Sequence, residues 1–392
     1  MNIENWLKNK RTIFLEKKNS REANQYGYVT NRKLVVIESD DWGSIRMPSK
    51  EICEEIRKTD VNIDRHPFFR YDGLAGERDL ENLYEVLSSV NDQNGKHPVF
   101  TANCAVANPD FDAIRKAEFE RYYYEPFTST LKKTKGCENA FALWKQGMKD
   151  EIFYPQLHCR EHFNVTRWMA DLQNRDAWLI MAFNHEMIST ASCKRKENEN
   201  TYMDAFNYDR IDERDVLAEI LTDAVSLFKK IFGYQSESFI ASCYIWGHEL
   251  EKVMYKNGIR YIQGEPLQRI PSNSTGTSNM GQIRHYMGDT NEYGQHYLIR
   301  NCNFEPSFNP NKDWVDIALN GIDIAFQNQK PAVICSHRLN YIGRIDEKNS
   351  DQNLKSLERL LNQIVCRWPD VEFITSVELG RIIGEDDESE HI

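Results

Sequence analysis

Residues Lys33–Gly43, with the sequence KLVVIESDDWG, place the strongest constraint on the fold of this chain. Leu34 to Ile37 form an unbroken run of apolar, mostly β-branched residues, which is typical of a parallel strand buried on both faces. The segment continues to two adjacent carboxylates, Asp40 and Asp41. In α/β barrels and open α/β sheets, ligands bind at the carboxyl ends of the strands. The segment therefore predicts a central strand with a carboxylate pair at the functional edge of the sheet.

An Asp-Asp pair has a simpler explanation, because aspartate also favours helix caps and turns. Adjacent residues of a regular strand point to opposite faces, so Asp40 and Asp41 cannot share one role while the strand stays regular. Where a strand curls into a loop, both carboxylates can reach one metal ion and its water. The pair by itself leaves both interpretations open.

The rest of the chain alternates between short apolar strands and helical segments. Further strands are expected at 97–102, 152–157, 238–241, 259–262, 282–286, 297–300, 331–335 and 371–374. The clearest helices are expected at 79–90, 211–232, 312–327 and 351–366. This alternation predicts an α/β fold with a mostly parallel sheet and crossover helices. About seven parallel strands suit a barrel better than an open sheet, although the pattern alone does not separate the two.

One domain with insertions is the simplest organisation, since the chain has neither a sequence repeat nor a linker rich in Pro, Gly and Ser. The predicted parts are an N-terminal helical extension at 1–32, a barrel at 33–384 and an acidic tail at 385–392. Long insertions are expected at 60–78, 103–150 and 190–210.

Composition excludes some functions and indicates a compartment. A net charge of −11 argues against a nucleic-acid-binding protein, which would present a basic face. The nine cysteines include no CxxC pair, which suits a reducing compartment better than a disulfide framework. No apolar run is long enough for a signal peptide or a membrane span, so we expect a soluble, cytoplasmic protein if Met1 is the natural start. The sequence does not indicate an oligomeric state.

A second group of chemically active residues follows another predicted strand. His158 and His162 are four residues apart, and on a helical turn this spacing places both rings on one face, within reach of one metal ion. An isolated HxxxH is more often a pair of ordinary surface or core histidines. Together with the Asp pair at another strand end, it favours a catalytic divalent-metal site made of two His, one Asp and a water. His337 also follows an apolar strand, and the strand-to-loop segment Phe239–Tyr244 ends in a tyrosine.

The order of these motifs resembles the polysaccharide deacetylases, the carbohydrate esterase family 4 or NodB-homology enzymes. The matching features are strand-Asp-Asp-x-Gly, HxxxH, a strand ending in Tyr and a late strand ending in His, within residues 33–375. The resemblance implies a distorted (β/α)7-type barrel. It also implies a metal-dependent hydrolase that removes acetyl groups from an N-acetylated sugar, either a polysaccharide or a precursor.

The resemblance further implies a role for each matching residue. Asp40 would be the catalytic base and His337 the general acid, while the backbone amide of Tyr244 would help to hold the oxyanion. A divalent metal ion, expected to be zinc, would be bound by three residues of the chain: Asp41, His158 and His162.

The sequence departs from the family pattern at several positions. Trp42 stands where the family usually has Gly after the Asp pair, and Cys159 stands where it has Ser or Thr. Phe239–Tyr244 lacks the usual Arg and Pro, and the Asp-containing motif that orients the acid is not found. The chain therefore resembles a divergent branch of the family.

Three other functions remain open from the sequence. An O-acetyl carbohydrate esterase would use the same site, and a non-catalytic sugar-binding relative would keep the barrel without turnover. A glycoside hydrolase would need two carboxylates roughly 5–9.5 Å apart, and no second strand-end carboxylate stands out.

The surroundings of the site are less well defined by the sequence. Residues that can line a sugar site are Arg46, Arg160, Glu161, His185, Trp246, His248, Arg300 and Asn301. Each of these residue types is more often a solvated charge, a cap or a core contact. Because no export signal is visible, we expect the substrate to be an acetylated carbohydrate that is available in the cytoplasm, such as a precursor sugar. The long insertions can form the sides of a closed pocket for such a substrate.

Overall fold

A computed structural model describes residues 18, 20–190, 193, 202–271 and 280–390 of the chain. Most of the predicted N-terminal helical extension lies outside the described residues, as does the middle of the insertion expected at 190–210. In the described part of the chain, no helix is both long and apolar enough to cross a membrane.

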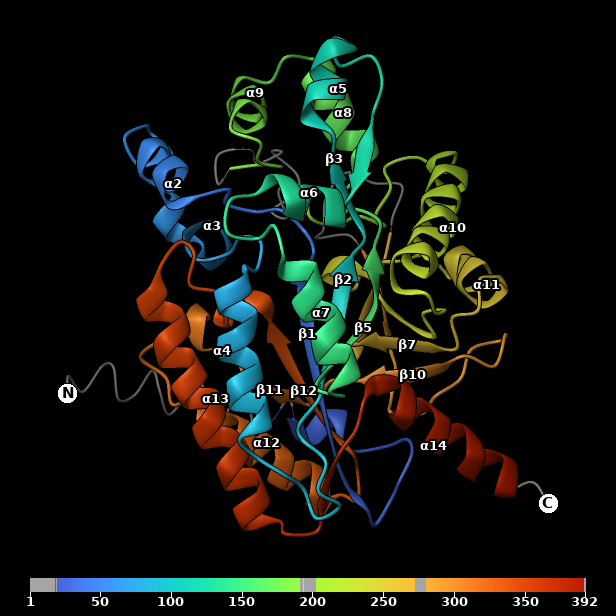
Figure 1. Cartoon of the computed structure of the whole chain (residues 1–392). Coiled ribbons are helices and arrows are strands. Elements are labelled where there is room, and N and C mark those ends of the chain that lie inside the picture. The colour runs from blue at the N-terminus through green and yellow to red at the C-terminus, as the bar shows by residue number, and fades with distance from the viewer. Residues whose placement is uncertain (1–17, 19, 191–192, 194–201, 272–279, 391–392) are drawn as a thin grey trace.

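A sheet of nine strands runs through the middle of the molecule (Figure 1), and its strands pair in parallel. In spatial order the main path is β10 (His296–Ile299), β7 (Tyr261–Gly264), β6 (Ser238–Ile240), β5 (Phe153–Cys159), β2 (Phe100–Ala105), β1 (Lys33–Trp42), β12 (Ala332–His337) and β11 (Cys302–Asn303). The ninth strand, β13 (Val371–Phe373), pairs with the start of β1. The Asp-Asp strand is therefore central, as the sequence predicts.

The two ends of this path, β10 and β11, are consecutive in the chain and are separated only by Arg300 and Asn301. The backbone N–H of Arg300 donates to the carbonyl of Gly264 in β7 (2.8 Å), and that of Asn301 donates to Val333 in β12 (3.2 Å). One bent strand thus pairs with β7 through its first half and with β12 through its second half. Seven strands close into a ring when β10 and β11 count as one, which confirms the predicted distorted (β/α)7-type barrel.

Helices cover the outside of the barrel between successive strands. They are α4 (Glu77–Ser88), α7 (Ala140–Lys149), α10 (Glu213–Phe232), α11 (His248–Lys256), α12 (Trp314–Gln327), α13 (Glu347–Arg367) and α14 (Ser376–Glu390). The long helices α10, α12 and α13 overlap those predicted from apolar periodicity, because each buries one apolar face against the barrel. Between β7 and β10, the described residues form an antiparallel hairpin, β8 (Leu267–Ile270) and β9 (Gly281–Arg284). The strand expected at 282–286 belongs to this hairpin and not to the barrel.

The insertions follow the carboxyl ends of β1, β2 and β5 and form the upper part of the molecule in Figure 1. After β1 come α2 (Lys50–Ile56), η1 (Ile63–Arg65) and α3 (Pro67–Arg70). After β2 come β3 (Ala107–Pro109), α5 (Phe111–Lys116), β4 (Tyr124–Pro126) and α6 (Phe127–Lys133), and after β5 come α8 (Val165–Gln173) and α9 (Ala177–Asn184). This layer lies over the barrel end at which the Asp pair and His158 are found.

A β-bulge in β1 sets the direction of the Asp pair. Between Ser39 and Trp42, β1 uses one residue more than its partner β2, and Asp41 has a left-handed φ of 73°. The left-handed conformation costs a non-glycine residue about 1–2 kcal/mol. The extra residue lets Asp40 and Asp41 both face the barrel interior, where each has its own partners. Adjacent residues can therefore serve one site although the strand period alone would separate them.

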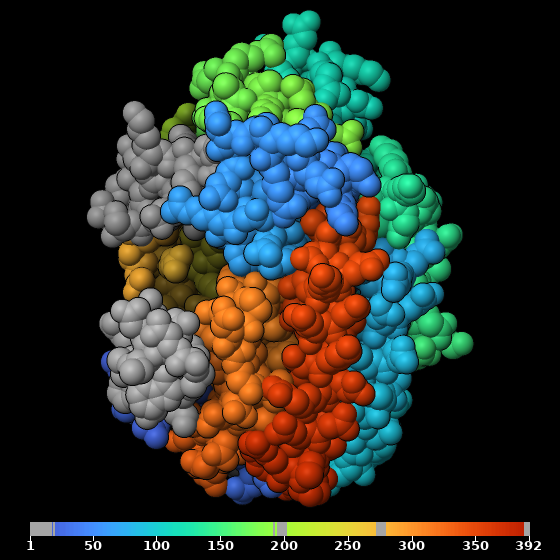
Figure 2. Space-filling view, turned by 90° about the vertical axis from the view of Figure 1, so that its left-hand side faces the viewer, coloured from blue at the N-terminus to red at the C-terminus, as the bar shows by residue number. Residues whose placement is uncertain are grey.

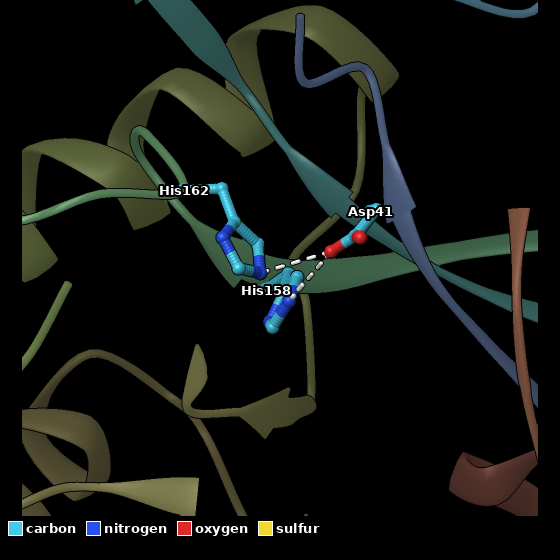
Figure 3. A group of neighbouring side chains, drawn as sticks. All are labelled: Asp41, His158 and His162. Carbon is cyan, nitrogen blue, oxygen red and sulfur yellow. Dashed lines mark ion pairs between the residues drawn. The ribbon is translucent and has the colours of Figure 1, made fainter. Parts of the chain in front are cut away.

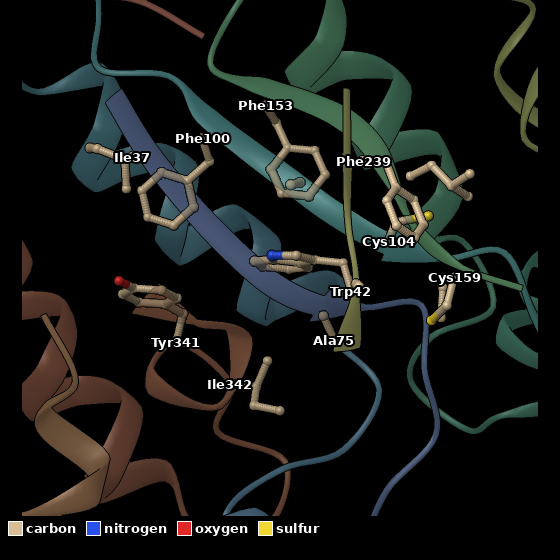
Figure 4. Packing of buried hydrophobic residues seen from close by; sticks show 14 of the residues in the cluster. Ile37, Trp42, Ala75, Phe100, Cys104, Phe153, Cys159, Phe239, Tyr341 and Ile342 are labelled. Atoms are coloured by element: carbon tan, nitrogen blue, oxygen red, sulfur yellow. The ribbon is translucent and has the colours of Figure 1, made fainter. Parts of the chain in front are cut away.

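Trp42 faces the opposite side of β1 and is fully buried (Figure 4). Its ring makes edge contacts with Trp144 of α7 and with Phe153 of β5, at centroid distances of 6.1 and 4.9 Å. Its indole N–H donates to the hydroxyl of Ser39 (3.0 Å). Trp42 thus fills the core between sheet and helix and does not enter the interior of the barrel.

The barrel interior holds a buried ionic group. The Arg300 guanidinium donates through Nε to Glu38 Oε2 (2.6 Å) and through Nη1 and Nη2 to both oxygens of Asp40 (2.7 Å each). Asn103 Nδ2 also donates to Asp40 Oδ1 (2.9 Å). Burial raises the pKa of Glu38, whereas Arg300 overcomes burial at Asp40 and holds the pKa of that carboxyl well below its usual range.

This group predicts a large stability cost for Arg300→Met. The substitution leaves two buried carboxylates without their counterion, and breaking a buried ion pair typically costs about 3–5 kcal/mol. The midpoint of urea-induced unfolding, followed by circular dichroism, measures the effect. Arg359→Met is the control, since Arg359 pairs with Asp313 on the surface (2.6 Å) and such pairs contribute about 0–1 kcal/mol. Equal midpoints for the two variants would contradict the prediction.

Candidate active site

Asp41, His158 and His162 converge at the upper end of the barrel (Figure 3). Asp41 Oδ1 lies 2.9 Å from His162 Nε2 and 3.6 Å from His158 Nε2. All three side chains are buried, and one ligand atom from each lies within 4.8 Å of the others. The geometry brings together the three residues that the resemblance suggests as metal ligands.

The two histidines reach this position by a different route from the one expected. His158 lies within β5, and the chain then bends at residues 160–163. This bend brings the ring of His162 back beside that of His158. The expected helical turn is therefore wrong. The two ring centroids are 4.6 Å apart. The bend is fixed by Arg160, which donates to Glu161 (2.8 Å) and to Asp223 of α10 (2.9 Å). Strand β5 extends past His158 because β2 pairs with the residues on either side of it, Leu157 and Cys159.

The donor set fits a divalent metal ion. His158 Nδ1 lies 2.8 Å from the carbonyl of Ile240, so Nδ1 carries the hydrogen and the lone pair of Nε2 faces the Asp41 carboxylate. Two acceptors that face each other in a buried site require a cation or a proton between them. Ligand atoms bound to one tetrahedral zinc at about 2.0–2.2 Å lie roughly 3.3–3.6 Å apart. The distances from Asp41 Oδ1 to the two histidine nitrogens, 2.9 and 3.6 Å, are close to this range.

The charge states of these side chains also match those of ligands. Burial opposes ionisation of Asp41, but His162 and Arg46 hold the pKa of its carboxyl well below its usual range. Burial lowers the pKa of His162 to about 4. Arg46 Nη2 lies 3.3 Å from both Asp41 Oδ2 and His162 Nδ1, so this arginine contacts the ligand residues themselves.

A second set of side chains lies beside the first and contains Asp40, His337 and Glu305. His337 Nε2 is 3.9 Å from Asp40 Oδ2, and His337 Nδ1 is 2.5 Å from Glu305 Oε1. Asn340 donates to the other oxygen of Glu305 (2.9 Å). Burial works against the charged imidazole, but Glu305 and Asp40 raise the pKa of His337 to about 9. His337 is therefore protonated at neutral pH, with Nε2 directed to the side of Asp40.

Sequence reasoning missed Glu305 and did not single out Arg300. Glu305 follows β11, a strand of only two residues that shows no periodic pattern, and its partner His337 is 32 positions away. Arg300 appeared only among eight residues that can line a sugar site. No local signal marks either residue, because each is defined by a contact between distant segments.

Tyr244 lies beside Arg300, but its backbone amide is engaged elsewhere. The Tyr244 N–H donates to the carbonyl of Ala241 (3.0 Å) within a turn where Cys243 and Tyr244 both have positive φ. Its hydroxyl lies 3.1 Å from Arg300 Nη1. In this structure the hydroxyl, and not the amide, is the group of Tyr244 next to the Asp40–Arg300 pair. The oxyanion role of the amide stays a prediction.

A second cluster with metal-ligating side chains consists of Glu305, Cys335 and His337. Glu305 and His337 already bind each other, and Arg300 Nη1 lies 3.3 Å from Cys335 Sγ. Asn340 donates to the other oxygen of Glu305, and burial raises the pKa of the Cys335 thiol. The ligand atoms of this cluster are thus engaged or protonated, so the Asp41 group is the better metal candidate.

Other residues considered for a sugar site make contacts of their own. His185 Nδ1 contacts the carbonyl of Met181 (2.8 Å) at the end of α9. Trp246 and His248 both approach Glu251, at 3.1 and 3.6 Å. These contacts within the protein explain the positions of all three side chains, so no sugar ligand is needed to explain them.

Comparisons with known proteins find similar folds. No family model matches the chain, and no curated protein is similar to it. A Mycobacterium smegmatis structure described as a polysaccharide deacetylase is 8% identical to this chain, with a TM-score of 0.44. The match covers 92% of this chain and 94% of that chain. One from Pseudomonas aeruginosa PAO1, with the same description, is 10% identical (TM-score 0.42; 90% and 91% covered). A Thermococcus litoralis 4-alpha-glucanotransferase is 8% identical (TM-score 0.45; 89% of this chain, 40% of that chain). The site's own residues therefore carry the functional assignment.

The geometry predicts that the protein binds one equivalent of a divalent ion through the Asp41 group. His158→Gln and His162→Gln are each expected to lower the bound metal to below about a tenth of an equivalent after dialysis, because each removes a nitrogen ligand. Elemental analysis of the purified proteins measures this.

His248→Gln is the matched control, since this histidine is exposed and lies on α11, and it should keep the wild-type metal content. Unchanged metal content in both site variants would show that the ion is held elsewhere.

Proposed function

We propose that this chain is a divalent-metal-dependent hydrolase that removes acetyl groups from an N-acetylated sugar. The observation that carries the proposal is the juxtaposition of two sets of side chains at one barrel end. The Asp41 group supplies three metal ligands, and the adjacent set supplies a carboxylate, Asp40, and a protonated acid, His337. Hydrolysis of an acetamide by a metal-activated water uses these three components together.

Asp41, His158 and His162 would hold a divalent ion, which we expect to be zinc, and such an ion would supply Lewis-acid polarisation of the acetyl carbonyl and of a water molecule. Asp40 takes the proton from the attacking water. Arg300 and Asn103 fix both oxygens of Asp40 and keep it ionised at neutral pH. Asp40 is therefore positioned as a base by contacts within the barrel, independently of the substrate.

His337 donates a proton to the departing nitrogen. An amine leaves readily only when it is protonated, so an amide substrate needs an acid on the leaving-group side. Glu305 binds Nδ1 and thereby fixes the orientation of the ring, with Nε2 as the proton donor. The Glu305–His337 pair thus takes the place of the acid-orienting motif that the sequence lacks.

The competing functions fit the site less well. A sugar-binding protein without turnover has no need for a buried base beside a protonated histidine. A glycoside hydrolase needs a sugar between two carboxylates, but the imidazole of His337 stands between Asp40 and Glu305. An O-acetyl esterase remains the second candidate, because it would use the same ligands, base and acid.

We further propose that the substrate is a small precursor sugar in the cytoplasm. The metal-ligand group is buried beneath the insertions, with Phe68 and Met203 both in contact with Arg46. This burial favours a short substrate over a long polymer. All nine cysteines are free, as is usual in a reducing compartment.

Asp40→Asn is expected to keep bound metal and lower turnover about 10²–10⁴-fold, because it removes the base but preserves the shape of the side chain. Acetate release from an N-acetylated sugar, with metal content measured in parallel, tests this. Asp313→Asn changes an exposed aspartate of the same type and should leave activity unchanged. Near-normal turnover in Asp40→Asn would show that another group is the base.

Glu305→Gln is expected to move the alkaline limb of the pH–activity profile to lower pH. The acid works only while His337 is protonated, so activity falls as pH rises through its pKa, and Glu305 raises that pKa. Loss of a nearby opposite charge shifts a pKa by about 1–3 units. The profile of acetate release measures the shift. Glu372→Gln, at a surface pair with Arg32, is the control, and an identical alkaline limb in both variants would remove Glu305 from the mechanism.

A further inference from the structure

Two phenylalanines border His337, the most accessible functional side chain of the site. The Phe68 ring lies 5.4 Å from the His337 ring and 5.5 Å from that of Phe308, and Phe308 lies 6.0 Å from His337. The two phenylalanine rings stand at 87° to one another, and together they are called the aromatic corner. On the face shown in Figure 2, the segment after β1 meets the segment after β11, and the surface is hollowed beside this border.

The exposure of His337 indicates that the substrate approaches the site at the aromatic corner. The side chains of Asp40, Asp41 and both candidate histidine ligands are at most 7% exposed, whereas the side chain of His337 is 21% exposed. The acid must contact the leaving nitrogen, and in an N-acetylated sugar that nitrogen is bonded directly to the sugar ring. The ring therefore has to lie within one or two bonds of His337, which is where the aromatic corner stands.

The rings of Phe68 and Phe308 differ in how much of their surface is available to a ligand. Phe68 is already in contact with the imidazole of His66, stacked at 5.5 Å, and with the Arg46 guanidinium at 5.2 Å. Phe308 is 41% exposed, and its ring contacts are with Phe68 and His337. Phe308 is thus the ring with a surface available to a ligand, and Phe68 forms a fixed wall beside it.

Phe308 is held by a rigid turn. It ends the short helix η4 (Pro306–Phe308), directly after Glu305, which orients the acid. Ser307 within this turn accepts a hydrogen bond from Asn353 of α13 (2.9 Å), and its N–H donates to Asn340 (2.9 Å). The same turn therefore fixes both the partner of His337 and the exposed ring.

We propose that the aromatic corner is the binding site for the sugar ring of the substrate, with a pyranose packed against the face of Phe308. The C–H groups on one face of a pyranose form an apolar surface that packs on an aromatic ring, and the exposed edge keeps its hydroxyls in water. This inference rests on the proposed function and adds the part of the substrate that the reacting groups do not recognise. Phe308 is a specificity residue for sugars over other acetylated compounds.

The test compares Phe308→Ala with wild type on N-acetylglucosamine and on ethyl acetate, an acetyl donor without a sugar ring. Phe308→Ala should raise KM for the sugar about tenfold with kcat within about twofold, and should leave ethyl acetate hydrolysis unchanged. Phe308→Trp, which keeps an aromatic face, should restore the wild-type KM. Tyr255→Ala is the matched control, because Tyr255 is also 41% exposed but lies on α11.

Binding of N-acetylglucosamine, followed by NMR titration, separates this inference from the proposed function. If Phe308→Ala weakens binding about tenfold while wild type releases no acetate, the corner is confirmed and the hydrolase is wrong. If wild type releases acetate and Phe308→Ala has the same KM and affinity, the hydrolase is confirmed and the corner is overturned. If wild type neither binds nor cleaves the sugar, both proposals fail.

Discussion

The ionic contact between Arg300 and Asp40 is the constraint on which the barrel and its site both depend. Arg300 lies at the point where β10 passes into β11, so its backbone joins the ring of strands while its side chain fills the interior. The guanidinium neutralises Asp40 and Glu38, two carboxylates that would otherwise be buried without a counterion. Arg300 therefore contributes both to closing the barrel and to positioning the Asp40 carboxylate.

The bulge in β1 divides two adjacent aspartates between two tasks. Asp40 binds Arg300 and approaches His337, and Asp41 turns to His158 and His162. A regular strand would send one of them into the outer core, where Trp42 now packs. The strained backbone at Asp41 is the cost of this arrangement, and the candidate metal ligands and the Asp40 carboxylate consequently lie side by side.

The insertions determine what can reach this chemistry. They bury the ligand group and leave His337 as the accessible functional side chain, bordered by Phe68 from one insertion and Phe308 from the turn that carries Glu305. The barrel end thus exposes His337 in part and keeps Asp40 and the candidate metal ligands buried. Such an arrangement suits a substrate whose acetyl group enters the barrel while its sugar ring stays at the mouth.

The sequence by itself determined the parallel α/β sheet and its strand ends, because apolar β-branched runs and the polar residues that follow them are local signals. The barrel was implied by the family resemblance and not by the pattern of strands. Asp40, Asp41, His158 and His337 could be named from these signals alone. The tertiary structure decided the bulge at Asp41, the bend that returns His162, and the roles of Arg300, Glu305 and Phe308. These features depend on contacts between distant segments, such as Arg300 and Asp40, which are 260 positions apart, and no local pattern of residues encodes such contacts.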